Sequence, residues 1–124
     1  DLRFGENAGA TGTTYSEFLV RYEAAYGETP PAAFHAHTYD ATMLLLTGIA
    51  AVAVVDADGT MHVDRQALRD ALTATTGFPG MIGTLACDAF GDCGSQAISV
   101  VKHLDSSDPA GSKANVVYSF SPTG

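Results

Sequence analysis

Positive charge is scarce in this sequence, because 6 lysine and arginine residues stand against 14 aspartate and glutamate residues. The formal net charge of -8 repels both the phosphate backbone of nucleic acids and the headgroups of anionic lipids. The composition therefore argues against nucleic acid as a partner.

Long hydrophobic runs are also missing. The apolar run at residues 41–55 is shorter than the roughly 20 residues that a membrane-spanning helix needs, and Asp40 and Asp56 stand at its ends. We expect a buried helix there instead, because 124 residues with 46% hydrophobic content suffice for one compact domain with a single core.

The start of the chain lacks an initiator methionine and the apolar core of a signal peptide. Residues 1–13 are polar and punctuated by glycine, which is typical of a loop or linker. We expect a processed product or a piece excised from a longer protein.

Cysteine is limited to Cys87 and Cys93, which flank the segment DAFGD. This spacing suits a short disulfide across a turn better than a redox C-x-x-C pair or half of a zinc site. Because disulfides persist in oxidising surroundings, we expect an extracytoplasmic protein.

A first, amphipathic helix is predicted to follow Thr14. Thr14 and Glu17 have the capping-box pattern, and Gly27 suits the position just past the helix end. The residues of its expected buried face recur at helical spacing: Tyr15, Phe18, Leu19, Tyr22 and Tyr26.

A second helix is predicted to begin near Thr38 or Tyr39, because Pro30 and Pro31 disfavour a helical conformation just ahead of them. It continues through the apolar run. The segment directly before this helix carries aromatic and imidazole side chains.

A third helix is predicted after Asp64, which is a suitable N-cap. Val63 and Leu68 occupy the two positions of a hydrophobic staple, and Gly77 followed by Pro79 ends the pattern. Since one face alone is apolar, this helix should lie on the surface of a larger layer.

Strands are predicted in the last third of the chain. Residues 83–87 and 96–104 have strand patterns and are joined by a turn at Asp88 to Gly94, and residues 115–121 form a third strand after a polar loop at residues 105–113. The resulting fold class is α/β, with about three helices followed by two or three strands.

Two acidic segments suggest chemistry but fit turns better. In the segment DADGT, an EF-hand register would place Val54 and Arg65 where calcium requires carboxylates. Asp88 and Asp92 surround a glycine turn, which is more typical of a hairpin than of acid/base catalysis.

His35 and His37 form an H-x-H pair that could bind zinc from a strand if a third ligand were near. His62 and His103 lie far along the chain, so structural or ligand-contacting roles are favoured. Neither a G-x-S-x-G elbow nor a phosphate-binding glycine loop is present, and no metal or cofactor is expected.

The segment that contains His35 and His37 also lies at a predicted helix N-terminus, where free N–H groups favour an anionic group such as a carboxylate. The alternative is that Phe34 and Tyr39 simply pack in the core.

Two ordered strings carry a family resemblance. YSEFLVRYEAAYGETPPAAFHAHTYDATMLLLTGI and VDRQALRDALTATTGFPGMIGTLACDAFGDCGSQAISVV resemble the C-terminal third of type I periplasmic solute-binding proteins of the branched-chain amino acid (Leu/Ile/Val) ABC import family. The resemblance covers residues 14–101, about seven-tenths of the chain. Its motif positions are Tyr22, Tyr26, Gly27, Pro30, Tyr39, Asp40, Ala41, Gly77, Phe78, Gly80, Gly83, Leu85, Asp88, Gly91 and Asp92.

The resemblance implies part of a bilobed α/β protein that traps a small molecule as its lobes close. We expect a linker at residues 1–13, the C-terminal part of the solute-binding domain at residues 14–101, and a polar loop with a terminal strand of the second lobe at residues 102–124. The disulfide would stiffen the family's hairpin. Upstream parts of the parent would hold most polar groups of the ligand.

The resemblance also implies ligand-binding residues before the second helix. Phe34 is the first choice, followed by His35 and His37, because alternate residues of an extended segment would face the cleft. Tyr39 is a further candidate, although Tyr39 and Asp40 are expected mainly to anchor the helix start.

We therefore predict a non-enzymatic substrate-binding component of an ABC importer for branched-chain or related amino acids or small polar solutes. Its partners would be such a ligand and the permease, in a periplasmic or extracellular parent for which a lipid anchor is one option. Exposed strand edges would favour self-association of the fragment.

Two alternatives stay open at this point. One is a ligand-sensing regulator or receptor domain with the same fold. The other is a small secreted hydrolase that uses His35 or His37 together with Asp40.

Overall fold

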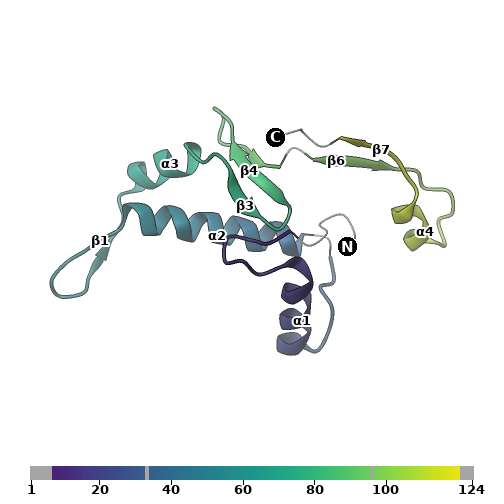
Figure 1. Ribbon diagram of the computed structural model, residues 1–124, viewed down its shortest axis with the longest axis horizontal. Helices are drawn as coiled ribbons and strands as arrows, with labels where there is room; N and C mark the ends of the chain where they lie inside the picture. Colours follow the sequence, from purple (N-terminus) through teal and green to yellow (C-terminus); the bar gives the residue numbers. More distant parts are fainter. Residues whose placement is uncertain (1–6, 33, 96, 121–124) are drawn as a thin grey trace. The chain divides into compact units, whose positions relative to one another are not determined.

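The chain divides into two units, Asp1–Cys93 and Gly94–Gly124. The computed structural model describes residues 7–32, 34–95 and 97–120 (Figure 1). Its elements, in order, are α1 (Tyr15–Tyr26), α2 (His35–Val52), β1 (Val54–Val55), β2 (Met61–His62), α3 (Arg65–Thr73), β3 (Phe78–Gly80), β4 (Gly83–Cys87), β5 (Cys93–Gly94), β6 (Ile98–Val101), α4 (Pro109–Ala114) and β7 (Val116–Phe120). This mixture of helices and short strands confirms the predicted α/β class.

The start of α1 has the predicted capping box. The Glu17 N–H donates to the Thr14 Oγ1 at 3.2 Å, and the Thr14 N–H donates to the Glu17 Oε2 at 2.9 Å. Gly27 closes the helix with φ of 75°, a left-handed conformation that glycine adopts without a steric penalty. Local sequence therefore sets both ends of α1.

Helix α2 begins at His35, three residues before the predicted start. Pro30 and Pro31 restrict the residue ahead of each ring, so they do not prevent a helix that begins four residues later. Phe34 is the N-cap, and its carbonyl accepts from the Thr38 N–H at 2.9 Å. The segment expected to be extended is therefore the first turn of α2.

Helix α2 is less buried than its apolar sequence suggests. Its buried residues are Ala36, Asp40 and Gly48, whereas Leu45 is 43% exposed. Within this unit α2 packs against α1 and the β3–β4 hairpin at one end and against α3 along its second half (Figure 1). The predicted burial of this helix is therefore met only in part, because the unit has too few layers to surround α2.

Helix α3 lies beside the second half of α2 because Gly48 leaves room for it. A Cβ atom at Gly48 would lie 3.1 Å from both the Leu68 Cδ1 and the Leu72 Cδ2. The predicted N-cap is confirmed, since the Asp64 Oδ1 accepts from the Ala67 N–H at 2.8 Å. Between the helices, β1 and β2 pair around the predicted turn, where Gly59 has φ of 86°.

The β3–β4 hairpin turns at Met81 and Ile82, and Asp40 binds this turn. The carboxylate oxygens of Asp40 accept from the Met81 N–H and the Ile82 N–H, each at 2.9 Å. Asp40 is 1% exposed, and a Cβ atom at Gly80 would lie 2.7 Å from its Oδ2. The turn thus requires glycine next to the buried carboxylate.

The main core cluster lies where this turn meets α1 and the first turns of α2. Its buried members are Tyr15, Ala36 and Met81, with Phe18, Leu19, Tyr39 and Ile82 packed against them. The N-terminal segment covers it, since the Asn7 Nδ2 donates to the Met81 carbonyl at 3.3 Å.

The second unit has a different strand pairing from the predicted one. Strand β6 pairs with β7, with Ile98 opposite Phe120 and Val100 opposite Tyr118, whereas β4 lies between β3 and β5 in a separate sheet. The turn after residue 87 therefore does not join β4 to β6. The polar loop also contains the short helix α4, which Asp108 caps by accepting from the Gly111 N–H at 2.9 Å.

Replacement of Asp40 by asparagine should destabilise the first unit. An asparagine side chain has one acceptor oxygen, so the Met81 N–H or the Ile82 N–H would lose its partner. We expect the free energy of unfolding in urea to fall by about 2 to 3 kcal/mol. Asp92→Asn makes the same chemical change at an exposed side chain and should have little effect; equal losses in both variants would contradict the role of Asp40.

The capping box should make α1 sensitive to acid. The Thr14 N–H and the Thr14 hydroxyl lower the pKa of Glu17 below its usual value. Stability from this carboxylate is therefore fully present at neutral pH and is lost as the pH falls through the lowered pKa. We expect Glu17→Ala to destabilise the protein at neutral pH and to match wild type in strong acid, with Glu23→Ala as control; a pH-independent difference would contradict this.

Candidate functional site

Aromatic rings join α1 to the first two turns of α2. His35 and Tyr39 are four residues apart and so share one face of α2. His35 stacks on Phe18, with ring centroids 5.9 Å apart and planes 8° apart, and on Tyr15 at 5.6 Å. Tyr39 meets Phe18 edge-on at 5.5 Å. Two of the four predicted ligand residues therefore face the interior.

Both nitrogen atoms of the His35 ring have partners within the chain. The Nδ1 lies 2.7 Å from the Ala32 carbonyl, and the Nε2 lies 2.7 Å from the Tyr15 hydroxyl. Because a carbonyl only accepts, Nδ1 carries the hydrogen in the neutral ring, and Nε2 accepts from Tyr15. His35 thus ties the loop before α2 to the first residue of α1.

Tyr39 holds the N-terminal segment. Its hydroxyl lies 2.6 Å from the Thr11 Oγ1, which itself donates to the Thr13 Oγ1 at 3.0 Å. The Tyr39 hydroxyl is therefore the donor to Thr11. Asp40 accepts from the β3–β4 turn, so both residues tie the first turns of α2 to other segments of the chain.

Phe34 and His37 lie on the other side of the helix start. Three residues apart, they share a face, and their rings meet edge-on with centroids 6.1 Å apart. Phe34 is 71% exposed, and His37 is exposed too. The alternation expected of an extended segment does not apply, because the 3.6-residue period of α2 separates His37 from His35.

This geometry does not bring Asp40 to an imidazole. Both carboxylate oxygens are used by backbone N–H groups, and Asp40 is almost fully buried. A base oriented by Asp40, as the hydrolase alternative requires, is therefore not formed. Among the residues that the structure describes, no group of three or more potential ligands could hold a metal ion.

The predicted disulfide is present between Cys87 and Cys93. Within the loop that it closes, the Asp88 Oδ1 accepts from the Phe90 N–H at 2.8 Å and from the Asp92 N–H at 3.0 Å. This carboxylate stabilises a turn, as expected. Phe90 stands at the tip of the loop and is 96% exposed.

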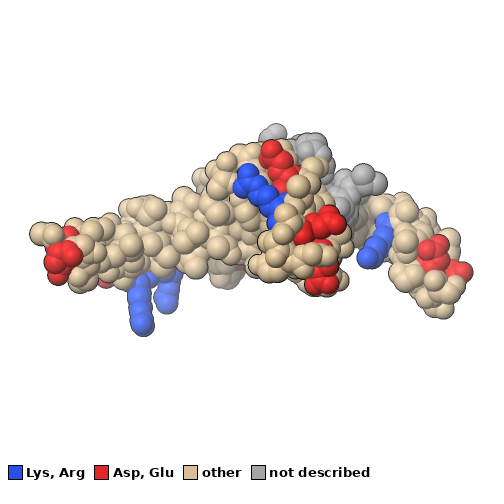
Figure 2. Space-filling model, turned by 90° about the horizontal axis from the view of Figure 1, so that it is seen from below, with Lys and Arg blue, Asp and Glu red and all other residues tan. Residues whose placement is uncertain are grey.

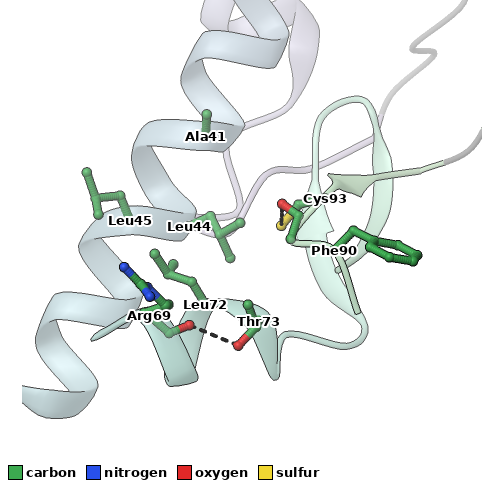
Figure 3. A pocket seen from close by; sticks show the side chains of 9 residues that line it. Ala41, Leu44, Leu45, Arg69, Leu72, Thr73, Phe90 and Cys93 are labelled. Carbon is green, nitrogen blue, oxygen red and sulfur yellow. Dashed lines mark hydrogen bonds between the residues drawn. The ribbon is translucent and has the colours of Figure 1, made fainter. Parts of the chain in front are cut away.

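A shallow groove of about 510 Å³ lies beside the disulfide loop (Figure 3). It is lined by Ala41, Leu44, Leu45, Arg69, Leu72, Thr73, Phe90, Gly91 and Cys93. Sequence reasoning missed it, because the leucines of α2 were assigned to a core that does not cover them. Their apolar run was the signal, but it does not distinguish a groove wall from a core.

Figure 2 shows one face of the molecule. On this face, the lysine and arginine side chains of the described residues do not form a continuous surface. This distribution agrees with the negative net charge of -8. No described helix has the length and apolarity that crossing a membrane requires.

Comparison with known families matches residues 5–106 to a family described as periplasmic binding protein. The matched region contains the contacting aromatic rings of α1 and α2, Asp40 and the disulfide loop. No curated protein and no solved structure matches the chain.

A structural role for His35 can be tested by its effect on stability. His35→Ala removes two hydrogen bonds and two stacked contacts, so the free energy of unfolding should fall by roughly 2 kcal/mol. His62→Ala is the matched control, since His62 pairs with Asp56 on the surface, and it should cost less than about 1 kcal/mol. Unchanged unfolding of the His35 variant would contradict the structural role.

Proposed function

The chain belongs to the periplasmic binding protein family, and from this premise we propose that it is the C-terminal part of a solute-binding component of an ABC importer. The proposed solutes are branched-chain or related amino acids and similar small polar molecules. The parent would deliver them to a membrane permease from a periplasmic or extracellular site. Binding and closure of two lobes would suffice, without bond breaking.

The exposed Phe34–His37 pair is the observation that carries this proposal. Phe34 is 71% exposed, so its ring is open to contact with a ligand. The Phe34 ring offers an apolar surface for the side chain of an amino acid, and His37 adds a polar edge beside it. We assign the ligand contact to these two residues.

The N-terminus of α2 supports a ligand with negative charge. Among the residues that the structure describes, no side chain caps this terminus, so the N–H groups and dipole of its first turn favour an anionic group nearby. Polar contacts to the rest of the solute would come from other parts of the parent, outside this chain.

In this proposal, three residues hold the start of α2 in place and do not contact the solute: His35, Tyr39 and Asp40. His35 and Tyr39 fix the face of α2 that turns towards α1. Asp40 fixes α2 to the β3–β4 turn. A helix start held by these contacts fixes the backbone position of Phe34, which lowers the entropy cost of binding.

Calorimetry with leucine, isoleucine and valine tests the proposal. The isolated chain should bind none of them with micromolar affinity, since it lacks most polar contacts. In the parent protein, Phe34→Ala should weaken binding of the transported solute by about tenfold or more, through loss of apolar contact.

Phe90→Ala is the matched control in the parent and should leave the affinity for the solute unchanged. Micromolar binding of leucine by this chain alone would contradict the proposal. An unchanged affinity of the Phe34 variant of the parent would contradict the assigned contact.

A further inference from the structure

The loop between the two cysteines is held by hydrogen bonds of its own as well as by the disulfide. The Asp88 N–H donates to the Asp92 carbonyl at 2.9 Å, and the Gly91 N–H donates to the Asp88 carbonyl at 3.1 Å. The Asp88 Oδ1 accepts from two further N–H groups, those of Phe90 and Asp92. Because all these partners lie between the cysteines, they keep the loop in this shape when the S–S bond is open.

The backbone of Cys87 is fixed from outside the loop. Strand β4, which ends at Cys87, pairs with β3, and the Cys87 N–H donates to the Thr75 carbonyl at 2.9 Å. The cysteines are 6 residues apart, and closing so short a loop removes less chain entropy than closing a long one. Opening the disulfide should therefore leave the first unit folded and the two thiols close together.

The two cysteines differ in their access to solvent. Cys93 is exposed, whereas Cys87 is half-buried. Because a thiolate opens a disulfide by attacking one of its sulfur atoms, the accessible sulfur of Cys93 is the point of attack and that of Cys87 is the leaving group. The Gly91 carbonyl lies 3.7 Å from the Cys93 Sγ, where it can accept from the thiol once the disulfide is open.

We propose that Cys87 and Cys93 form a reversible disulfide that exchanges with an external dithiol, of the kind that a C-x-x-C protein carries. A thiolate of the dithiol attacks the Cys93 Sγ, the S–S bond breaks, and the Cys87 Sγ leaves with the electron pair and takes up a proton. The second thiolate of the dithiol then displaces Cys93, which also takes up a proton. Two electrons and two protons pass from the dithiol, which becomes a disulfide, to the chain.

This exchange uses the disulfide loop and not the start of α2, so it does not rest on the proposed solute contact. A disulfide that only stiffens the hairpin is the competing interpretation. It predicts that the S–S bond is reduced only when the first unit unfolds.

Trapping the first step in the folded chain tests the point of attack. Mercaptoethanol is a suitable probe, because it is uncharged and the net charge of -8 does not repel it. After a maleimide has blocked the freed thiol, peptide mass spectrometry should find mercaptoethanol on Cys93 and the maleimide on Cys87. The opposite labelling, or labelling only in urea that unfolds the chain, would overturn the proposal.

Re-formation of the disulfide tests the hydrogen bonds of the loop. When the reduced chain is oxidised by hydroxyethyl disulfide, Asp88→Ala should slow the ring-closing step by about tenfold, since the two thiols are no longer held together. Asp92→Ala is the matched control: it removes the same charge from the loop, but the Asp92 backbone groups that bond to Asp88 stay in place.

Equal rates of ring closure in the two variants would contradict a loop that holds its thiols together. Circular dichroism of each reduced chain establishes that the helices are retained, and loss of the helices in the reduced wild-type chain would also overturn the proposal. The position of the mixed disulfide in the wild-type chain does not depend on either variant.

Discussion

The buried carboxylate of Asp40 is the contact on which the first unit depends. It binds two consecutive N–H groups, of Met81 and Ile82, at the tip of the β3–β4 hairpin. These bonds bring together α2 and a hairpin 41 residues further along the chain. Because an ionised acceptor strengthens a hydrogen bond and a buried one lacks water to replace it, the hairpin has one position relative to α2.

The remaining core is assembled around that contact. Met81 is fully buried in the cluster with Tyr15 and Ala36, and its carbonyl accepts from Asn7. The rings of His35 and Tyr39 extend the cluster to α1 and to the N-terminal segment. The start of α2 is consequently the best supported part of the unit, and it is also the part that presents Phe34.

Away from this cluster the unit leaves much apolar surface open. Leu45, Val54 and Phe90 are exposed in the first unit, and the residues of β6 and β7 are exposed in the second. The first unit has few layers of helices and strands with which to bury these side chains. Exposed apolar surface of this extent favours contacts with further protein.

The sequence by itself determined the features that depend on neighbours a few residues away. The capping box at Thr14, the N-cap at Asp64, the left-handed Gly27 and the short disulfide were all predicted correctly, because each involves groups within one turn or loop. Tertiary structure alone decided which strands pair, which side of α2 faces α1 and what Asp40 binds. Those outcomes depend on side chains and N–H groups far apart in sequence, whose meeting is set by packing and by the need to satisfy buried polar groups.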